Sequence, residues 1–325
     1  MYRQDPPFAI QLESVLGCNL SCDFCGINGI GYGNKANGLK FMTPQTAECI
    51  AQQIAEAGWT SRLEFALRGE PLLNPEVGEV VAAFRQHLPK SSITLLTNGG
   101  PLVKDPLTKI NGLFDAGLNR LVIEQYKHAP FFTKIRERLP ADLPFPVVNC
   151  PADGQQPTRM KPRERVLQFN SDPHDGDRGT YNKINNHGGY GDELVPYDKP
   201  CSKPFREMSI RWDGTVSYCC INWGGEGACG NVHEAHLQDI WNNERFHAVR
   251  QHLLHGMRTF MTCKGCNHPS YRSGLLPDKL GKRKDAYPVP AKNSKASRVI
   301  AAMEAEGFTE QPTPVYLNRK ASFKP

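Results

Sequence analysis

Three cysteines near the amino terminus have a spacing that suits a metal cluster. Cys18, Cys22 and Cys25 form the run CNLSCDFC, a C-x3-C-x2-C pattern. Three thiolates on one short loop can ligate three irons of a 4Fe–4S cluster and leave the fourth iron without a protein ligand. That iron can then bind a substrate or a cofactor. Zinc is the alternative, but structural zinc takes four ligands, and this loop contains no fourth Cys or His.

Four cysteines in the second half of the chain form another candidate metal site. Cys201 begins the run CSKPF, and Cys219 ends a predicted hairpin. Cys263 and Cys266 form the C-x2-C pair of CKGC. Two thiols beside a hairpin and a C-x2-C pair can close tetrahedrally around zinc, or they can ligate an iron–sulfur cluster. The spacing alone leaves both metals open.

The other four cysteines carry weaker signals. Cys49 falls in a predicted helix and is most simply a small buried apolar residue. Cys150 ends a predicted strand, at the rim where a substrate would lie. Cys220 adjoins Cys219 and is an alternative ligand, and Cys229 lies near the same group. A thiol that faces the substrate can return a hydrogen atom to a radical, so Cys150 and Cys220 are candidate catalytic residues.

Eleven cysteines without an export signal point to a reducing compartment. The first residues, MYRQDPPFAI, lack the apolar segment of a secretory signal, and no apolar run approaches the length of about 18 residues that spans a membrane. We therefore expect a cytoplasmic protein whose cysteines serve metal binding or catalysis rather than disulfides. The chain of 325 residues, 39 % of them hydrophobic, can fill one large core, alone or with a smaller second one.

An alternation of strands and helices positions the first cysteine loop. Residues 8–16 alternate in polarity and predict a strand directly before it. Thr43 and Pro44 predict a helix start, and Gly58 predicts its end. The repeated unit indicates an α/β protein with a parallel sheet, open or rolled into a partial barrel, whose active site lies at the carboxyl ends of the strands. Further strands are expected at 63–67, 93–96, 121–124, 146–149 and 165–169, with helices after Asn74-Pro75, before Gly117 and at 131–139.

Two short motifs follow the next two predicted strands. RGEP spans Arg68–Pro71, and TNG spans Thr97–Gly99. With the C-x3-C-x2-C run and the aromatic Phe24 before its third cysteine, this order of motifs resembles the radical S-adenosylmethionine (SAM) superfamily, although Arg68 replaces the first glycine of that family's GGEP. The resemblance implies a partial (β/α)6 barrel whose open iron chelates SAM. It also implies reductive cleavage of SAM to methionine and a 5′-deoxyadenosyl radical, which abstracts hydrogen from an organic substrate.

The same resemblance implies roles for five residues. Gly69 and Glu70 would meet the amino group of the SAM methionine, and Phe24 would pack near the adenine. Asn98 and Glu124, at the ends of two strands, are expected at the ribose. Glu124 stands where a smaller hydroxyl residue is frequent in the family, so it is equally a candidate catalytic residue that acts on the substrate. Turn, core and capping roles are the structural alternatives for these positions.

The second cysteine group resembles the SPASM/twitch extension of radical SAM enzymes. Besides the cysteines, the resemblance rests on CSKPF, IRWDG, GNV and DIW within residues 201–266. It implies one auxiliary 4Fe–4S cluster held by Cys201, Cys219, Cys263 and Cys266, because a full SPASM domain has seven cysteines and no cysteine follows Cys266 here. The layout is similar to that of a radical SAM dehydrogenase from an aminoglycoside pathway, in which the auxiliary cluster accepts the electron left on a substrate radical.

Three regions are expected along the chain: a radical SAM core at 1–197, a twitch/SPASM-like domain at 198–273 and a basic, partly disordered tail at 274–325. Residues 171–200 are rich in Gly, Asp and Asn and predict a loop over or beside the site, or a plain connector. SIRW and VSYCC predict a hairpin joined by Asp-Gly, and one amphipathic helix is expected over 237–253.

The tail carries most of the net charge. The chain has 39 Lys and Arg against 33 Asp and Glu, and ten of the basic but only five of the acidic residues lie from residue 274 onward. Lys282, Arg283 and Lys284 form the densest basic run, and one short helix is expected around 297–306. A solvated extension is one interpretation, and contact with a polyanion such as a nucleic acid is the other.

Two classes of function remain open. The favoured class is a radical SAM oxidoreductase that oxidises a small molecule, nucleotide or peptide and takes electrons from a donor such as flavodoxin or ferredoxin. Isomerisation, epimerisation or modification of a base are its alternatives. The short segment before the first strand leaves no room for a separate leader-binding domain, which disfavours peptide maturation. The rival class is a zinc-stabilised binding protein without chemistry.

Overall fold

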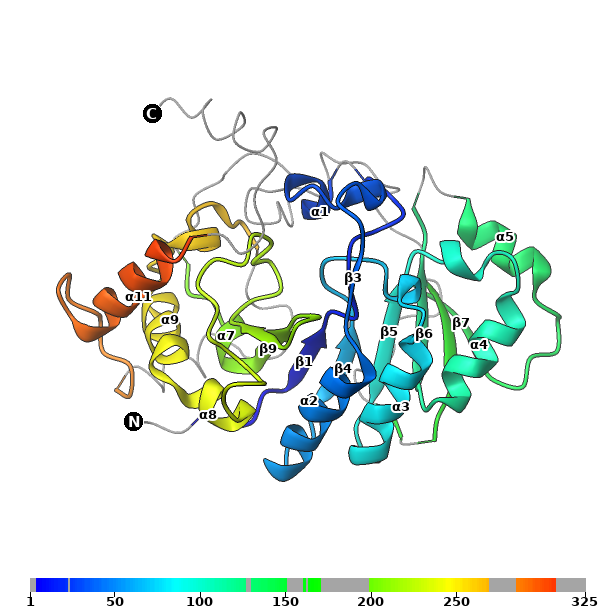
Figure 1. Cartoon of the computed structure of the whole chain (residues 1–325), viewed down its shortest axis with the longest axis horizontal. Coiled ribbons are helices and arrows are strands. Elements are labelled where there is room, and N and C mark those ends of the chain that lie inside the picture. The colour runs from blue at the N-terminus through cyan, green and yellow to red at the C-terminus, as the bar shows by residue number, and fades with distance from the viewer. Residues whose placement is uncertain are drawn as a thin grey trace.

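A nine-stranded sheet forms the centre of the molecule (Figure 1). The computed structural model describes residues 4–22, 24–126, 130–150, 160–161, 163–170, 199–268 and 285–307. The strands lie in the order β11-β10-β9-β1-β4-β5-β6-β8-β7. Their bounds are β1 Ala9–Leu12, β4 Arg62–Phe65, β5 Ile93–Thr97, β6 Arg120–Glu124, β7 Val147–Cys150, β8 Val166–Asn170, β9 Glu207–Ile210, β10 Thr215–Ser217 and β11 Gly230–Asn231.

Six strands of the core region, which we define as residues 4–170, run parallel. β1 pairs with β4, β4 with β5, β5 with β6, β6 with β8, and β8 with β7. The predicted α/β class with a largely parallel sheet is confirmed. One detail of the order is new, because β8 lies between β6 and β7. The last two parallel strands are therefore exchanged relative to their order in the chain.

Helices with well-defined ends accompany these strands. The predicted start of α2 (Pro44–Glu56) is confirmed, since the Thr43 hydroxyl accepts a hydrogen bond from the Thr46 N–H at 3.2 Å and Pro44 occupies the first turn. Gly58, with φ of +67°, lies just beyond its end. In Figure 1, α2, α3 and α4 run alongside the parallel strands. The remaining helices of this region are α1 Gly26–Gly29, α3 Val77–His87, α4 Pro106–Asp115, α5 Phe131–Arg138 and the 3-10 turns η1 Gly33–Lys35, η2 Pro71–Leu73 and η3 Gly100–Leu102.

The auxiliary region, defined as residues 199–307, shares this sheet with the core. β9 pairs in parallel with the free side of β1, in the register Ala9 with Glu207 through Leu12 with Ile210. β10 and β11 then continue antiparallel. The predicted hairpin is confirmed, and its turn is closed by Asp213, whose carboxylate accepts from the Thr215 N–H, and by Gly214 at φ +81°.

The predicted amphipathic helix over 237–253 is divided in two. α8 (Leu237–Asn242) ends where Asn243 leaves the helical conformation, and α9 (Glu244–Leu254) begins directly after it. Asn243 is the N-cap of α9, because its side chain accepts from the Phe246 N–H at 3.0 Å. The apolar spacing is continuous across this break, which is why periodicity alone merges the two helices.

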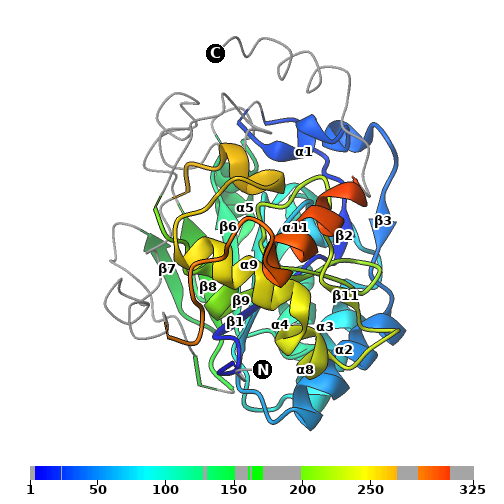
Figure 2. The same ribbon diagram turned by 90° about the vertical axis from the view of Figure 1, so that its left-hand side faces the viewer.

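Part of the tail packs against the auxiliary region. The predicted short helix forms as α11 (Lys295–Ala305), and it buries Ile300 and Met303 against α9 (Figure 2). Upstream of it, the fully buried Tyr287 packs against Phe205. Residues 171–198 of the loop predicted over 171–200, and the Lys282–Lys284 run, lie outside the described residues. No helix within the described ranges has the length and apolarity needed to cross a membrane.

Candidate active site and cluster sites

The first cysteine loop lies between two short paired strands that follow β1 in the chain. β2 (Val15–Leu16) pairs with β3 (Lys40–Phe41), and the loop leaves β2 through Gly17 at φ +119°. The Cys25 N–H donates to the Cys22 carbonyl, and Cys25 is the N-cap residue of α1. The loop thus turns back between Cys22 and Cys25. All three predicted cysteines lie in this loop, beyond the carboxyl end of β1.

The surroundings of these thiols disfavour the thiolate form unless a cation is bound. Burial raises the pKa of Cys18 to about 11, while the Leu20 N–H (3.4 Å) and the Asn98 amide (3.6 Å) point at its sulfur and act to lower it. Burial and the neighbouring Cys22 and Cys18 raise the pKa of Cys25 well above its ordinary value. Thiols that repel one another's charge are those that a shared cation stabilises.

Glu70 organises the strand end next to this loop. Its carboxylate accepts from the Thr97 hydroxyl at 2.6 Å, from the Asn98 N–H at 2.7 Å and from the Leu72 N–H at 3.1 Å. Burial raises the pKa of Glu70 to about 7 against these hydrogen bonds, which act to lower it. Asn98 in turn donates from its side chain toward Cys18. The predicted SAM contacts Glu70 and Asn98 therefore form one network that ends at a cluster cysteine.

Gly69 is required by close packing of the backbone. A Cβ at this position would lie 2.3 Å from the Val15 carbonyl oxygen and 2.6 Å from that of Gly17. Gly17 and Gly69 form an isolated parallel bridge, and the Glu70 N–H donates to the Gly17 carbonyl. The structure thus gives this glycine a packing role, and its contact with SAM stays a prediction.

Arg68, the departure from the family motif, connects the two regions. Its guanidinium donates to both carboxylate oxygens of Glu13, at 2.6 and 2.9 Å, and to the Trp223 carbonyl at 2.8 Å. Both charged side chains are almost fully buried. A planar guanidinium suits this bidentate pairing, and a glycine could not supply it. The side chain thus holds the end of β1 against the auxiliary region.

Phe24 and Glu124 have separate contacts near the end of β6. Phe24 is buried and packs its ring, tilted by 30°, at 6.0 Å from that of Tyr126. Glu124, at the end of β6, accepts a hydrogen bond from the Asn170 side chain at 2.7 Å. Asn170 pairs in register with Glu124 on one side and with Cys150 on the other. Three polar side chains therefore stand together at the carboxyl ends of β6, β8 and β7.

The four cysteines predicted for an auxiliary cluster surround one cavity. Its lining includes Cys201, Cys219, Cys263 and Cys266. They come from the start of α7 (Lys203–Arg206), the end of the hairpin and the 3-10 turn η5 (Met261–Gly265). Burial raises the pKa of Cys201, Cys263 and Cys266, and the hydrogen bond with Cys220 together with burial raises that of Cys219. Their convergence on one enclosed space fits a cluster ligated by the four thiolates.

Three further side chains line the cavity with chemistry relevant to a negatively charged cluster. Lys203 lies 3.1 Å from the Glu207 carboxylate and 3.5 Å from the Cys220 sulfur. Arg258 is held by the carbonyls of Lys199 and Cys266, at 2.9 and 3.1 Å. Tyr218 is fully buried, and burial raises the pKa of its phenol well above the ordinary value. The cavity thus combines two cations with a hydroxyl group.

The remaining cysteines separate clearly. Cys219 lines the cavity and Cys220 does not, which favours Cys219 as the ligand. The hydrogen bond from Cys219 and the nearby Lys203 lower the pKa of Cys220, although burial acts to raise it. Cys229 lies elsewhere, in a pocket between α9 and α11, where burial raises its pKa to about 12. Cys49 packs partly buried against the core, as expected for an apolar role.

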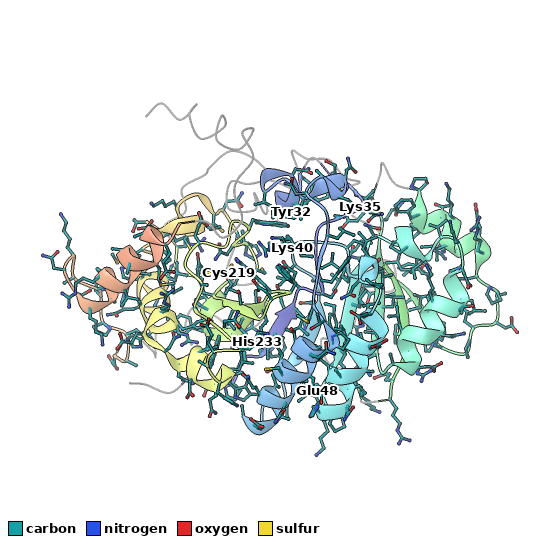
Figure 3. All side chains as sticks on the ribbon, viewed as in Figure 1. Tyr32, Lys35, Lys40, Glu48, Cys219 and His233 are labelled. Carbon is teal, nitrogen blue, oxygen red and sulfur yellow. The ribbon has the colours of Figure 1, made fainter. Side chains whose placement is uncertain are left out.

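An apolar cluster fills the space between the two cysteine sites. It contains Leu16, Ile27, Ile30 and Tyr32 from the core, together with Ile221, Trp223 and Cys266 from the auxiliary region, and Cys18, Cys25, Cys219 and Cys220 pack against it. Lys40 lies 5.5 Å from the centroids of both the Tyr32 and the Trp212 rings. Figure 3 labels Tyr32 and Lys40 beside this junction and Cys219 across from them. The two cysteine sites thus share a packed interface.

Several of these residues were not singled out from the sequence. Asn170 directly follows a predicted strand, so its position at the rim could have been found. Glu13 and Trp223 carry no local signal, because their role depends on contacts with Arg68 across 55 and 155 residues of chain. Tyr218 precedes a predicted ligand, which was a usable signal. Within the described part of the chain, no three His, Cys, Asp or Glu side chains are arranged to hold a single metal ion.

The fold and the two cysteine sites define an α/β protein built to carry iron–sulfur chemistry. The family model of the radical SAM superfamily matches residues 12–126, and that of the SPASM iron–sulfur cluster-binding domain matches residues 201–267. The chain belongs to the radical SAM superfamily and carries a SPASM-type domain. Its cofactors are SAM, a radical SAM 4Fe–4S cluster and auxiliary iron–sulfur cluster binding in the SPASM-type domain. The rival interpretation as a zinc-stabilised binding protein is set aside.

Similar proteins span most of the chain. The S-adenosyl-L-methionine-dependent 2-deoxy-scyllo-inosamine dehydrogenase of Niallia circulans is 23 % identical over 81 % of this chain and 94 % of its own length. A GTP 3′,8-cyclase of Mycolicibacterium smegmatis is 33 % identical over 44 % of this chain and 38 % of its own. The crystal structure of BtrN in complex with AdoMet and 2-DOIA superposes with a TM-score of 0.63 at 22 % identity, covering 83 % of this chain and 96 % of that one, and supports the fold.

Proposed function

We propose that this protein is a radical SAM dehydrogenase that oxidises a secondary alcohol of a small, polar, amine-bearing substrate to a ketone. The cavity lined by four cysteines carries the proposal, because it is a built site for an electron acceptor beside the radical SAM core. The similarity to a dehydrogenase over 94 % of that enzyme's length supports the reaction class. The polar rim at the strand ends supports a hydroxylated or amino substrate.

The atoms and electrons of this oxidation balance when both clusters are bound. When bound, the clusters supply the electron that cleaves SAM and take up the electron that the oxidation releases. One hydrogen atom leaves the carbinol carbon and ends in 5′-deoxyadenosine. The hydroxyl proton goes to a base, and the remaining electron leaves the substrate as the carbonyl double bond forms. In sum, one SAM and one alcohol give methionine, 5′-deoxyadenosine, one ketone and one proton.

Glu124 is our candidate for the base at the rim. Its carboxylate lies at the carboxyl end of β6, where the substrate of a parallel α/β site binds. The Asn170 amide, which donates to it at 2.7 Å, orients it. Phe24, Gly69, Glu70 and Asn98 remain our proposed SAM-binding residues, with Glu70 acting through the network that it organises.

The test is product analysis under anaerobic conditions. The reconstituted protein, SAM and a chemical reductant are incubated with a panel of aminocyclitols and amino sugars, and 5′-deoxyadenosine and carbonyl products are measured by mass spectrometry. We expect the two products in a one-to-one ratio with a cognate substrate. Stoichiometric 5′-deoxyadenosine with a substrate that returns at its original mass would contradict the proposal.

Epimerisation is the second candidate, because Cys150 is the strand partner of Asn170 at the same rim. A thiol there would return a hydrogen atom to the substrate carbon. In D2O, an epimerase would yield a product of unchanged oxidation state that carries one deuterium, and Cys150→Ala would prevent it. A dehydrogenase would yield a ketone, and Cys150→Ala would retain that reaction.

Two partner proposals accompany the function. An external one-electron donor such as flavodoxin or ferredoxin would reduce the first cluster. The basic residues of the tail would attract a polyanion, although Lys295 of α11 already forms an ion pair with Glu244. Changing Lys282, Arg283 and Lys284 to Gln is therefore a sharper test than deleting the tail. Deletion would also remove the buried Tyr287 and Met303.

A further inference from the structure

One hydroxyl group at the auxiliary cavity has a burial that its protein neighbours do not explain. Tyr218 directly follows β10 and is fully shielded from solvent. Its hydroxyl oxygen has no hydrogen-bond partner among the described residues. Leaving a buried hydroxyl without a partner carries a free-energy cost, so such a group ordinarily marks a partner that is not a protein atom.

The surroundings of Tyr218 indicate what that partner is. The residue lines the cavity that the four predicted ligands surround. Cys219 and Cys263, two of those ligands, belong to the same lining as Tyr218. The Phe260 ring, with its centroid at 6.5 Å, packs beside the tyrosine ring.

We propose that the Tyr218 hydroxyl donates a hydrogen bond to a sulfur of the auxiliary cluster, and that this bond raises the potential at which the cluster accepts an electron. The reduced cluster carries one more negative charge than the oxidised cluster. A donor therefore stabilises the reduced form more strongly. Lys203 and Arg258, which line the same cavity, act in the same direction.

The hydrogen bond itself depends only on the cluster being bound. Its benefit for turnover rests on the proposed function, because an acceptor with a higher potential draws the second electron from the substrate.

The experiment measures the potential of the auxiliary cluster without SAM or substrate. The full chain with Cys18, Cys22 and Cys25 changed to Ala is reconstituted, so that only the auxiliary cluster reports, and it is titrated with Tyr218→Phe added or omitted. At a fixed potential, we expect Tyr218→Phe to lower the ratio of reduced to oxidised cluster by about tenfold, which is about 59 mV for one electron. Tyr287→Phe is the matched control, because Tyr287 is equally buried but its hydroxyl already pairs with Gln4.

Two results would overturn the proposal. One is an unchanged potential in Tyr218→Phe. The other is loss of the auxiliary iron from a normally folded variant, because a tuning hydroxyl is not needed to hold the cluster. A second measurement leaves the hydroxyl in place: replacing tyrosine by 3-fluorotyrosine makes the phenol a stronger donor and should raise the potential. Absence of a ketone product from the unsubstituted enzyme would refute the proposed function and leave this result standing.

Discussion

The two cysteine sites differ in the charges that surround them. The first loop has backbone and amide donors directed at Cys18, and its closest charged influence is the Glu70 carboxylate. The auxiliary cavity has two cations, Lys203 and Arg258, in its lining. Because the potential of a cluster depends on nearby charge and hydrogen bonds, these surroundings predict different potentials for clusters held in the two sites.

Removing a thiolate from the first loop should have the largest effect. We expect Cys22→Ala to reduce formation of 5′-deoxyadenosine to background, because two thiolates do not hold a cluster with one open iron. The measurement is 5′-deoxyadenosine formed from SAM and a chemical reductant. The triple Cys18/Cys22/Cys25→Ala protein should retain about four irons, the complement of one cubane. A triple variant without iron would remove the support for a second, independent site.

Breaking the connection between the two regions should have the next largest effect. Arg68→Met leaves the buried Glu13 without its bidentate partner, so we expect a loss of about 3–5 kcal/mol in the free energy of unfolding. Urea denaturation of the reconstituted protein measures it. Arg165→Met is the matched control, because it removes an exposed pair with Asp115 and should cost about 0–1 kcal/mol. A similar loss in both variants would show that the buried pair is not special.

The raised pKa of Glu70 predicts a pH effect of defined sign. Between its ordinary value of about 4.3 and the folded value of about 7, the folded protein binds more protons at Glu70 than the unfolded protein does. The contribution of this group is therefore present at low pH and is lost as pH rises toward 7, by up to about 3 kcal/mol. Glu70→Gln should lack this slope. The difference between the two proteins in urea denaturation from pH 4.5 to 8 isolates it, and a constant difference would contradict the assignment.

A small change at the junction should have the smallest effect. A Cβ on Gly26 would lie 2.5 Å from the Trp223 ring, so Gly26→Ala must displace that ring from the first loop. We expect a loss of about 2 kcal/mol, which is within the usual range for overpacking. Gly112→Ala in α4 is the control, because nothing lies near its added Cβ and it should stabilise the helix slightly. Equal thermal shifts in the two variants would show that the junction is loosely packed.

The sequence predicted the local parts of this molecule well and the long-range parts poorly. The cap at Thr43, the Asp213-Gly214 turn and the cysteine spacings depend on nearby residues, and the structure places them as expected. The contact of Arg68 with Trp223 and the pairing of β9 with β1 join residues far apart in the chain, and no local pattern encodes them. Asn243 was missed for another reason, since continuous apolar spacing conceals a polar cap.

The pairing of β9 with β1 also sets an order of events during synthesis. β1 is made before its partner β9, which follows about 200 residues later. At a synthesis rate of about 5–20 residues per second, one edge of β1 waits for roughly 10–40 seconds without its strand partner. An unpaired strand edge whose side chains are destined for the core invites pairing with other chains. The need to protect nascent β1 therefore follows from a sheet that is completed from both ends of the chain.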